Sequence, residues 1–390
     1  MIHLFLNGLG ASAGAGLTYL YNVLPQLSAL PEVRTTLAVH PDLRSEFSDF
    51  PNIALAEACP ASGAARRFWF EQSELPALIR KSEADVLISA GNFALRNSPV
   101  PQILLSGNSL YTSPDFYRDL RSRSEYRMWA DTRIKGVFAA RSVHWADRTV
   151  APSQAFAHDL RQWTGKEVLA IHHGFDRKVF FADPSGLPDP IPQKLHAAKS
   201  CLKLLFVSHY NYYRNFETLL RAVPLLRQSL PGRDVRLFLT CELRPGANPG
   251  AYNPERAAAL VQQLGIREQV VELGAVPYRS LHHLYRACDV YVTPAYTETF
   301  AHPLVEAMAS GLPIAASDLP VHREVCGSAA QYFPRFSPEK LAETVFAIAT
   351  SPQASNQSIV ADRSAEFSWS DHVQQLLEVA NSIRSPVARC

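Results

Sequence analysis

Cysteine is scarce in this sequence, and the few cysteines form no pattern. Six stand among 390 residues, without a Cys-x-x-Cys pair, and they lie among apolar neighbours. This distribution excludes a typical zinc site and a disulfide framework, because both need closely spaced or paired cysteines. We therefore expect reduced thiols in a hydrophobic core, as in a cytoplasmic protein.

The sequence also lacks an excess of either charge. The 38 Lys and Arg residues nearly balance the 36 Asp and Glu residues, for a formal net charge of +2. A protein that binds nucleic acid through charge has a strong basic excess, so we expect no nucleic-acid partner. No apolar run reaches the roughly 18 residues of a membrane span. Residues 1–6 carry no basic segment of the kind that opens a signal peptide, and they predict a first strand.

Short and continuous apolar runs recur along the chain. Such runs are typical of strands that are buried on both faces of a parallel sheet. Helix-sized segments, such as 214–229 and 254–264, separate many of them. This alternation predicts an α/β, doubly wound architecture. The expected strands are 2–6, 35–39, 85–90, 102–106, 148–152, 167–171, 203–208, 234–240, 289–293 and 313–317.

Ten strands are too many for one ordinary open sheet, so we expect two domains. Residues 183–193 hold four prolines and a glycine, which neither a helix nor a central strand tolerates. We therefore place a linker at 183–198, between domains at 1–182 and 199–370. The last segment, 371–390, is expected to form a helix that packs back toward the N-terminal domain.

A glycine-rich loop follows the first expected strand. Four glycines lie within residues 8–16, ahead of a helical pattern. Such a loop lets the backbone approach a ligand closely, and the helix start behind it offers free N–H groups to an anion. We expect Gly14, Ala15 and Gly16 to contact a phosphate or the acceptor, and the alternative is a flexible turn.

Two loops in the second half carry charged residues after expected strands. His209 and Arg214 follow the run 203–208, where cations can pair with a diphosphate. Glu298 follows the run 289–293, and Glu306 lies in the helix behind it. A helix start favours a bound phosphate. A carboxylate can accept two hydrogen bonds from vicinal hydroxyls, so the second loop predicts a site for a ribose or a hexose.

The motifs around these residues resemble the retaining glycosyltransferases of the GT-B fold, the large family four. The most specific match is the spacing Glu-x7-Glu, from Glu298 to Glu306, where Glu306 begins the motif EAMASGLP. The resemblance covers most of residues 148–380 and is loose over the first 147. The other matches are Ala151–Ser153, His173–Asp176 with Phe180, Leu284–Val290, Ile314–Asp318 with Glu324 and Val325, and Trp369.

This resemblance implies two Rossmann-like, doubly wound domains that face a central cleft. The implied activity is retaining, metal-independent transfer of a hexose-type sugar from a nucleotide-diphosphate sugar to a hydroxyl. The donor would bind to the second domain, and a glycan, lipid-linked or small-molecule acceptor would bind against the first. The nucleotide sugar is a co-substrate, and no cofactor is expected. No Asp-x-Asp pair occurs, which is the motif through which the other glycosyltransferase fold holds a metal.

The resemblance also assigns roles to individual residues. Glu298 would lie beside the donor sugar, and Glu306 would bind the ribose. His209 and Arg214 stand where the family places an Arg and a Lys that hold the diphosphate, so the site carries less charge than usual. The rest of the donor loop is Thr299, Phe300, Ala301, which replaces the usual Gly, and His302, which is either a sugar contact or a space-filling residue.

Catalysis is expected to depend on Glu298, Arg214 and Asn108. The stretch 106–111 lacks the His that the family often carries there, and Asn108 is the candidate to bond a hydroxyl. The departing diphosphate can itself accept the acceptor's proton on the same face of the sugar. The protein then mainly positions the reactants and stabilises the leaving group.

Two alternative functions remain open. One is a sugar-nucleotide epimerase or phosphorylase on the same fold, and the other is a catalytically degenerate protein that only binds sugars or nucleotides. Segments 66–70 and 118–148 combine basic and aromatic residues. They predict either peripheral contact with an anionic membrane or a lipid-diphosphate acceptor, or else solvated helix faces over core aromatics.

Overall fold

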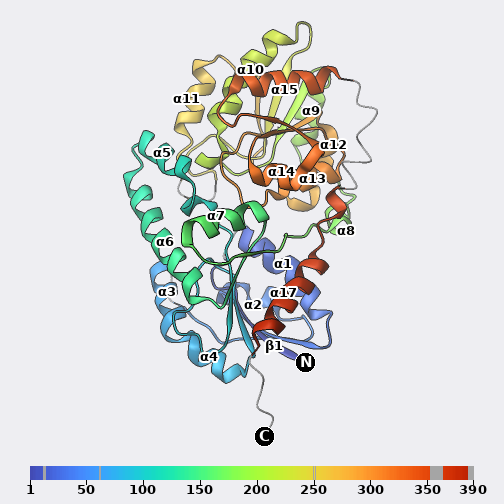
Figure 1. The fold of residues 1–390 in the computed structure, drawn as a ribbon. Helices are drawn as coiled ribbons and strands as arrows, with labels where there is room; N and C mark the ends of the chain where they lie inside the picture. Colours follow the sequence, from blue (N-terminus) through green and yellow to red (C-terminus); the bar gives the residue numbers. More distant parts are fainter. Residues whose placement is uncertain (12–14, 61–62, 249, 251, 352–362, 385–390) are drawn as a thin grey trace. The chain divides into compact units, whose positions relative to one another are not determined.

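The structure is a computed structural model that describes residues 1–11, 15–60, 63–248, 250, 252–351 and 363–384. The chain divides into two compact units, each built on a parallel sheet with helices around it (Figure 1). Unit 1 comprises Met1–Thr112, Ser124–Gly174 and Ser368–Cys390, and unit 2 comprises Ser113–Arg123 and Phe175–Phe367. The predicted α/β, doubly wound architecture is confirmed.

The sheet of unit 1 has the strand order β3-β2-β1-β4-β5-β6-β7 among the described residues, and every pairing in it is parallel. Its strands are β1 Ile2–Asn7, β2 Val33–Ala38, β3 Ile53–Leu55, β4 Val86–Ser89, β5 Gln102–Leu105, β6 Arg148–Ala151 and β7 Leu169–Ala170. Its helices are α1 Ala15–Ser28, α2 Arg44–Phe47, α3 Ala64–Ser73, α4 Leu75–Ser82, α6 Tyr126–Trp145, α7 Gln154–Thr164 and α17 Trp369–Ile383.

The sheet of unit 2 has the order β10-β9-β8-β11-β12-β13 in the described part of the chain, again all parallel. Its strands are β8 Leu202–Phe206, β9 Val235–Leu239, β10 Val270–Glu272, β11 Val290–Thr293, β12 Ile314–Ser317 and β13 Ala330–Phe333. Its helices are α5 Pro114–Ser122, α8 Arg177–Phe180, α9 Ile191–Ala197, α10 Phe216–Ser229, α11 Glu255–Gln263, α12 Leu281–Ala287, α13 His302–Ala309, α14 Pro320–Cys326 and α15 Pro338–Thr350.

The three strands that the sequence did not predict, β3, β10 and β13, all lie at the edge of a sheet. They have three or four residues each, and none of them is buried along its whole length. Edge strands need not be apolar on both faces, so these strands lack the continuous apolar run that marks the central ones. The ten predicted strands all correspond to strands of the structure.

The boundaries between the units differ from the predicted domain boundaries. Unit 2 begins at Phe175, before the expected end at residue 182, and it also takes in Ser113–Arg123. The proline-rich stretch 183–193 leads into α9 rather than into a free linker. Lys194 on that helix donates through Nζ to the carbonyl of Glu272 at 2.7 Å, which ties the segment to the sheet of unit 2.

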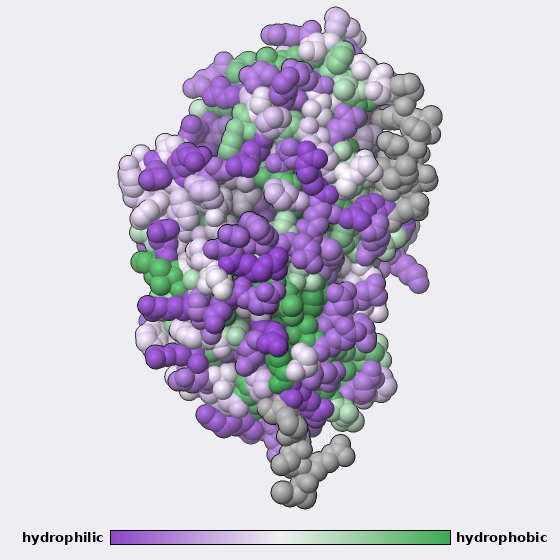
Figure 2. Space-filling view, viewed as in Figure 1, coloured by the Kyte–Doolittle hydropathy of each residue, from purple (hydrophilic) through white to green (hydrophobic). Residues whose placement is uncertain are grey.

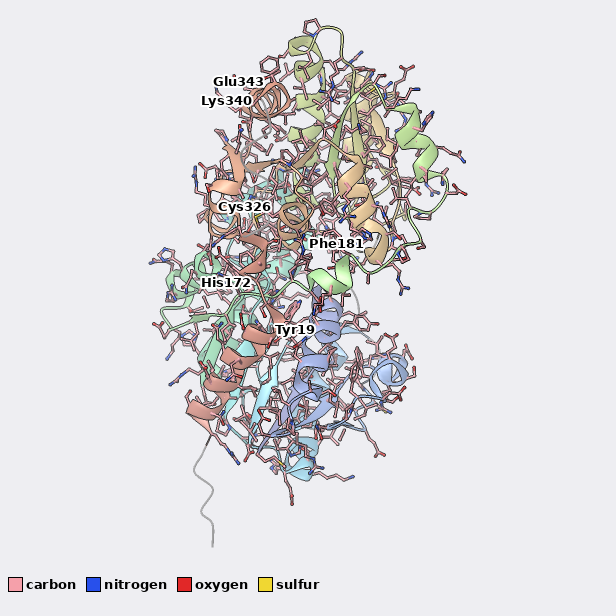
Figure 3. The ribbon with its side chains drawn as sticks, turned by 90° about the vertical axis from the view of Figure 1, so that its right-hand side faces the viewer. Tyr19, His172, Phe181, Cys326, Lys340 and Glu343 are labelled. Carbon is pink, nitrogen blue, oxygen red and sulfur yellow. The ribbon has the colours of Figure 1, made fainter. Side chains whose placement is uncertain are left out.

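The C-terminal helix α17 belongs to unit 1, where it packs against α1 (Figure 1). Its apolar side contributes Val373, Leu376 and other residues to the core that covers β1 and β2. His372 also joins two labelled residues of Figure 3: its Nε2 accepts from the Tyr19 hydroxyl at 2.9 Å, and its Nδ1 donates to the His172 carbonyl at 2.8 Å. The predicted helix 371–390 corresponds to α17, apart from residues 385–390, which lie outside the described residues.

No helix in the described ranges is both long enough and apolar enough to cross a membrane.

Candidate functional site

The sheet of unit 2 reverses its winding between β8 and β11. These two strands are neighbours, while the chain continues from β8 toward β9 on one side and from β11 toward β12 on the other. Loops that follow such a pair of strands diverge, and the crevice between them is the usual ligand site in doubly wound sheets. In this chain the two loops carry Arg214 and Glu298, which the sequence predicts as site residues.

The loop after β8 ends in a short 3-10 helix, Tyr212–Arg214, followed by Asn215. Asn215 has a φ of 56°, in the left-handed region that Asn tolerates better than most residues. Its side-chain amide donates to the carbonyls of Pro294 at 3.0 Å and Arg335 at 2.6 Å. Asn215 therefore ties the loop after β8 to the loop after β11 and starts α10 at the same time.

The loop after β11 ends at Ala301, which has a φ of 67°. Helix α13 begins immediately afterwards, with Pro303 in its first turn, where the missing N–H is not needed. Phe300 is buried, and its ring lies 5.0 Å from that of His302 and 5.2 Å from that of Phe367, between centroids. Phe300 thus anchors the loop, and the predicted sugar contact His302 packs against it.

Arg214 and Glu298 form an ion pair through Nη1 and Oε1. Their side chains are 18% and 9% exposed, so the pair is largely shielded from water. The Glu298 carboxylate also accepts from the backbone N–H of Thr299, at 3.4 Å. The structure therefore brings together the two predicted catalytic residues of unit 2, which stand 84 positions apart in the sequence.

His209 lies on the same loop as Arg214. Its side chain is exposed, but partial loss of contact with water, and next the charge of Arg214, lower the pKa of His209 below its usual range. The imidazole is therefore mainly neutral near neutral pH. The predicted departure from the family pattern is thus a loss of positive charge at this position.

Glu306 is buried on α13, and the hydroxyl of Tyr285 donates to its Oε2 at 2.8 Å. Burial raises the pKa of Glu306 to about 7, and the hydrogen bond from Tyr285 opposes that shift. A carboxyl group with this pKa is only partly ionised at neutral pH. A ligand that supplies further hydrogen-bond donors would favour the ionised form.

His322 is a residue of this region that the sequence did not predict. It is fully buried on α14, and its Nδ1 donates to the Ser317 carbonyl at 2.8 Å. Burial lowers the pKa of His322 to about 4, and nearby Arg214 contributes to the shift. Ser317 in turn donates to the carbonyl of Ala295 at 2.5 Å, which links the end of β12 to the loop after β11. The expected strand 313–317, which ends at Ser317, was the available signal for this region.

The site residues predicted in the first domain are found in unit 1. The Asn108 side chain accepts from the N–H of Leu110 at 3.1 Å and caps a short 3-10 helix, Ser109–Tyr111. Gly14 lies outside the described residues, whereas Ala15 begins α1. A Cβ on Gly16 would lie 3.2 Å from the Cα of Ala11, so this glycine permits close packing of the loop on the helix.

The sheet of unit 1 has its own reversal point, between β1 and β4. The glycines that follow these strands, Gly10 and Gly91, are so close that a Cβ on Gly10 would lie 3.3 Å from the Cα of Gly91. The same Cβ would lie 4.0 Å from the guanidinium carbon of Arg67. Arg67 in turn lies 3.8 Å, from Nε to Oε1, from the buried carboxylate of Glu71.

Burial raises the pKa of Glu71, while Arg67 and the side chain of Asn7, at 3.4 Å, oppose that shift. Arg67 and Glu71 are thus a further polar pair at a ligand edge that sequence reasoning did not single out. Their signal was the basic-aromatic stretch 66–70, whose position on α3 only the fold reveals.

No group of three or more His, Cys, Asp or Glu side chains in the described ranges is arranged to hold a metal ion.

A comparison with family models matches residues 189–363 to the model described as glycosyl transferases group 1. Among curated proteins, the chain is similar to the D-inositol 3-phosphate glycosyltransferase of Nocardia farcinica, with 32% identity over 45% of this chain and 38% of that protein. It is also similar to the protein of the same name from Mycolicibacterium vanbaalenii, with 33% identity over 60% of this chain and 53% of that protein. The matches thus span about half or less of these relatives' own lengths.

Solved structures resemble almost the whole chain. Anabaena HepE in complex with UDP-glucose aligns with a TM-score of 0.71 at 16% identity, over 98% of this chain and 100% of that one. Sucrose-phosphate synthase from Thermosynechococcus elongatus aligns with a TM-score of 0.72 at 18% identity, over 98% and 99%. At this level of identity the likeness shows a shared fold of two Rossmann-like units.

Proposed function

We propose that this chain is a retaining glycosyltransferase of family four, because residues 189–363 match the model of the glycosyl transferases group 1 and the chain has the GT-B fold. It would move a hexose-type sugar from a nucleotide-diphosphate sugar to a hydroxyl of an acceptor. The observation that carries this proposal is the buried Arg214–Glu298 pair at the reversal point of unit 2. Such a pair would supply a cation for the diphosphate and a carboxylate for hydroxyls of the sugar.

We propose that the donor engages this pair by separating it. The Arg214 guanidinium would turn to the diphosphate, together with the N–H groups at the start of α13. Glu298 would then be free to accept hydrogen bonds from hydroxyls of the sugar. Glu306 would accept from the ribose hydroxyls in the same way, which compensates for the cost of its ionisation in a buried position.

In the transfer step, the acceptor oxygen forms a bond to the anomeric carbon as the bond from that carbon to the diphosphate oxygen breaks. The acceptor's proton passes to the departing diphosphate oxygen on the same face of the sugar, so the anomeric configuration is retained. Arg214 would stabilise the negative charge that develops on the leaving group, and Glu298 would hold the sugar in position. This charge neutralisation by the chain's own groups is the basis for proposing a metal-independent enzyme.

For the acceptor, we propose a site on unit 1 at its reversal point. Arg67 lies near Gly10, where the two loops that follow β1 and β4 pack closely, and Glu71 lies next to Arg67 on α3. The guanidinium of Arg67 suits an anionic group of the acceptor, and the carboxylate of Glu71 suits a hydroxyl. Asn108 caps its own 3-10 helix through its amide oxygen, and because that oxygen can accept a second hydrogen bond, Asn108 stays a candidate to bond a hydroxyl.

Peripheral membrane contact is a further part of the proposal. On the outer face of α6, Ile134 and Val137 are 60% and 52% exposed, beside the exposed Arg133 and Arg141. Figure 2 shows a small hydrophobic group over this helix, at the left edge of the view. Apolar and basic side chains on one helix face favour an anionic bilayer surface. Sedimentation with vesicles of neutral or of 30% anionic lipid tests this, and equal recovery in both supernatants contradicts it.

The first test of the function is nucleotide binding. Thermal unfolding is measured with UDP, GDP, ADP and TDP, because a ligand at 100 times its dissociation constant stabilises by about 2.7 kcal/mol. We expect one nucleotide to raise the melting temperature of the wild type but not of Glu306→Ala. The absence of a shift with all four, in a folded protein, would contradict the proposal.

The second test is turnover of the matching nucleotide sugar. We expect Glu298→Ala to lower sugar transfer by at least about 100-fold while it keeps the fold, because it removes the group that orients the sugar. Glu343→Ala is the matched control, since this glutamate is exposed on α15, where it pairs with Lys340 (Figure 3). Normal transfer by Glu298→Ala would exclude the role assigned to that residue.

The two alternative functions give different results in the same assays. An epimerase converts the donor, or releases a free nucleotide, in the absence of any acceptor. A degenerate binding protein shows the melting shift without turnover. The intact pair Arg214–Glu298 and the buried Glu306 favour an active transferase over both.

A further inference from the structure

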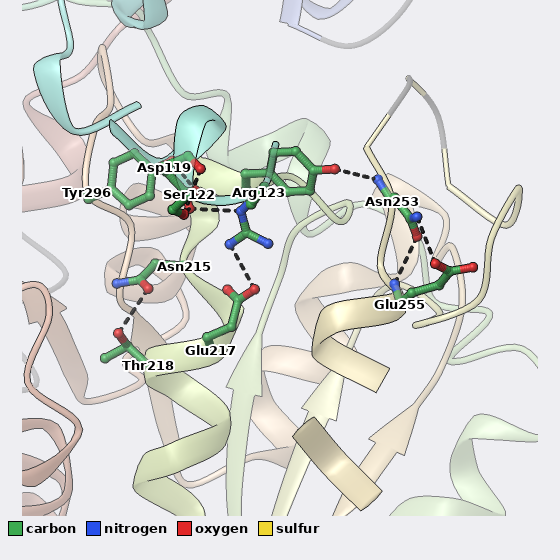
Figure 4. A network of polar contacts seen from close by, with 10 residues as sticks. Asp119, Ser122, Arg123, Asn215, Glu217, Thr218, Asn253, Glu255 and Tyr296 are labelled. Atoms are coloured by element: carbon green, nitrogen blue, oxygen red, sulfur yellow. Dashed lines mark hydrogen bonds and ion pairs between the residues drawn. The ribbon is translucent and has the colours of Figure 1, made fainter. Parts of the chain in front are cut away.

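Helix α5 belongs to unit 2, although its neighbours in the sequence belong to unit 1. The chain leaves unit 1 after Thr112, forms Pro114–Ser122, and returns at Ser124. Charged side chains of this helix and its C-cap meet both loops of the donor site, as Figure 4 shows. This helix is therefore placed to control the geometry of Arg214 and Glu298.

The first connection reaches the loop after β11. The hydroxyl of Tyr296 donates to Oδ2 of Asp119 at 2.8 Å, across 177 positions of sequence. Tyr296 stands two residues before Glu298 and is nearly fully buried. Its backbone N–H donates to the carbonyl of Tyr213 at 3.0 Å, so the same residue also joins the two donor loops.

The second connection reaches the loop after β8 through Arg123. Its Nε donates to Oδ1 of Asp119 at 2.8 Å, and its Nη2 lies 2.8 Å from Oε1 of Glu217 on α10. The guanidinium carbon stands 4.3 Å from the centre of the Tyr212 ring, two residues before Arg214. Only 8% of the Arg123 side chain is exposed, so these interactions are little screened by water.

A third connection lies at the other end of α5. Asp115 is buried, and its Oδ2 accepts from Nη2 of Arg335 at 2.5 Å. The backbone carbonyl of Arg335 accepts from Asn215, the residue that follows Arg214. The helix thus holds the neighbours of both catalytic side chains, while it touches neither of those side chains in any contact described above.

We propose that Asp119, Arg123 and Tyr296 are positioning residues for sugar transfer, which fix Arg214 and Glu298 through the two donor loops. This inference rests on the proposed function. Asp119 is the centre of the arrangement, because its two carboxylate oxygens each receive a donor from a different connection. Loss of one connection lets a loop shift, and a displacement of about 1 Å at a reacting group can cost about 100-fold in rate.

The effect should appear in turnover more than in binding. Glu306 and its partner Tyr285 lie on α13 and α12 and take no part in the three connections, so we expect the proposed ribose contact to persist when a loop shifts. For Asp119→Asn and Tyr296→Phe we expect kcat to fall at least 10-fold, with the dissociation constant for the nucleotide changed less than 3-fold. The double variant should lose little more than either single variant, because both remove the same bond.

The matched control is Arg121→Gln, an exposed position on the same helix that takes no part in the three connections. Its kcat should equal that of the wild type. If Asp119→Asn and Tyr296→Phe remain folded and keep a wild-type kcat, or if their losses simply add, the inference is overturned. A purely structural role would lower the melting temperature without changing kcat below it.

Hydrogen exchange separates failure of this inference from failure of the proposed function. The amides of residues 212–215 and 296–300 should exchange at least 10-fold faster in Tyr296→Phe than in the wild type, whether or not a donor is turned over. Unchanged exchange there would refute the positioning role by itself. A wild type that binds no nucleotide would refute the function, and the exchange result would still decide the positioning.

Discussion

Three ionisable residues of unit 2, Arg214, Glu298 and Glu306, carry the proposed chemistry. Arg214 pairs with Glu298, and both side chains are largely shielded from water. Glu306 is buried without a cation, and the hydrogen bond from Tyr285 only partly offsets its burial. A carboxylate in such a position lowers the stability of the fold, but it can accept hydrogen bonds from a ligand. That combination is common at functional sites, where stability and function conflict.

Glu306 makes the stability of unit 2 dependent on pH in a definite direction. Its pKa rises from an ordinary value of 4.5 to about 7 on folding. Its contribution to stability is therefore fully present below pH 4.5 and is lost as the pH rises toward 7. We expect Glu306→Gln, which keeps an acceptor for Tyr285, to be more stable than the wild type by up to about 3 kcal/mol at pH 8.

At pH 4.5 the same substitution should change the stability little. Denaturant unfolding at the two pH values measures both differences, and a gain that is equal at pH 4.5 and pH 8 would show that ionisation is not its cause. The gain in stability should be accompanied by weaker nucleotide binding, because the amide presents one acceptor instead of two.

At the scale of the elements, two residues in the left-handed region shape the site. Asn215 starts α10 and bridges the two loops, while Ala301 starts α13 directly behind the donor loop. The polar side chain of Asn can form hydrogen bonds that offset the cost of this backbone conformation, whereas the methyl group of Ala cannot. The backbone of the loop after β11 is therefore strained at Ala301, a position where the family that this sequence resembles usually has Gly.

Ala301→Gly should relieve this strain. The left-handed region destabilises the folded state by roughly 1–2 kcal/mol when Ala occupies it. Gly avoids this cost, but its greater freedom in the unfolded chain lowers the resulting gain in stability by about 0.4–1 kcal/mol. We expect a net increase of about 0.5–1 kcal/mol in the free energy of unfolding, measured by denaturant titration. Ala309→Gly, at the other end of the same helix, is the control and should lose about 1 kcal/mol. A loss of stability in Ala301→Gly would contradict this account.

At the scale of the whole molecule, the chain repeats one plan twice. Each unit is a parallel sheet with a reversal point, and a polar pair lies at each such point: Arg67 with Glu71, and Arg214 with Glu298. The last part of the chain returns to unit 1 as α17 and completes the core over β1. Unit 1 therefore depends on a segment more than 190 residues away in sequence from its nearest other part.

This dependence can be tested at Gly174, which lies directly against the start of α17. A Cβ on Gly174 would lie 2.1 Å from the backbone nitrogen of Trp369, which no side-chain movement can relieve. We expect Gly174→Ala to destabilise unit 1 by at least about 1–3 kcal/mol, because backbone must shift. Gly107→Ala is the control, since a Cβ there meets no neighbour within 4 Å. Equal melting temperatures for the two variants would contradict this prediction.

Much of the fold was predictable from the sequence because it depends on local pattern. Continuous apolar runs predicted all the central strands, since a strand covered on both faces must be apolar throughout. Exposed edge strands obey no such constraint, and β3, β10 and β13 were missed for that reason. The positions of Glu298 in a loop and of Glu306 in the following helix were also predictable, because the strand, turn and helix start around them depend on local sequence.

Tertiary structure alone decided which distant residues meet. The pair Arg214–Glu298 spans 84 positions and the bond from Tyr296 to Asp119 spans 177, and no periodicity along the chain encodes such contacts. It also decided that α5 belongs to unit 2 and that Arg67 and Glu71 stand at a ligand edge. Sequence by itself determined the elements and the types of side chain at their ends. Packing of the sheets determined which of those ends lie together, because burial and pairing of charge depend on neighbours in space.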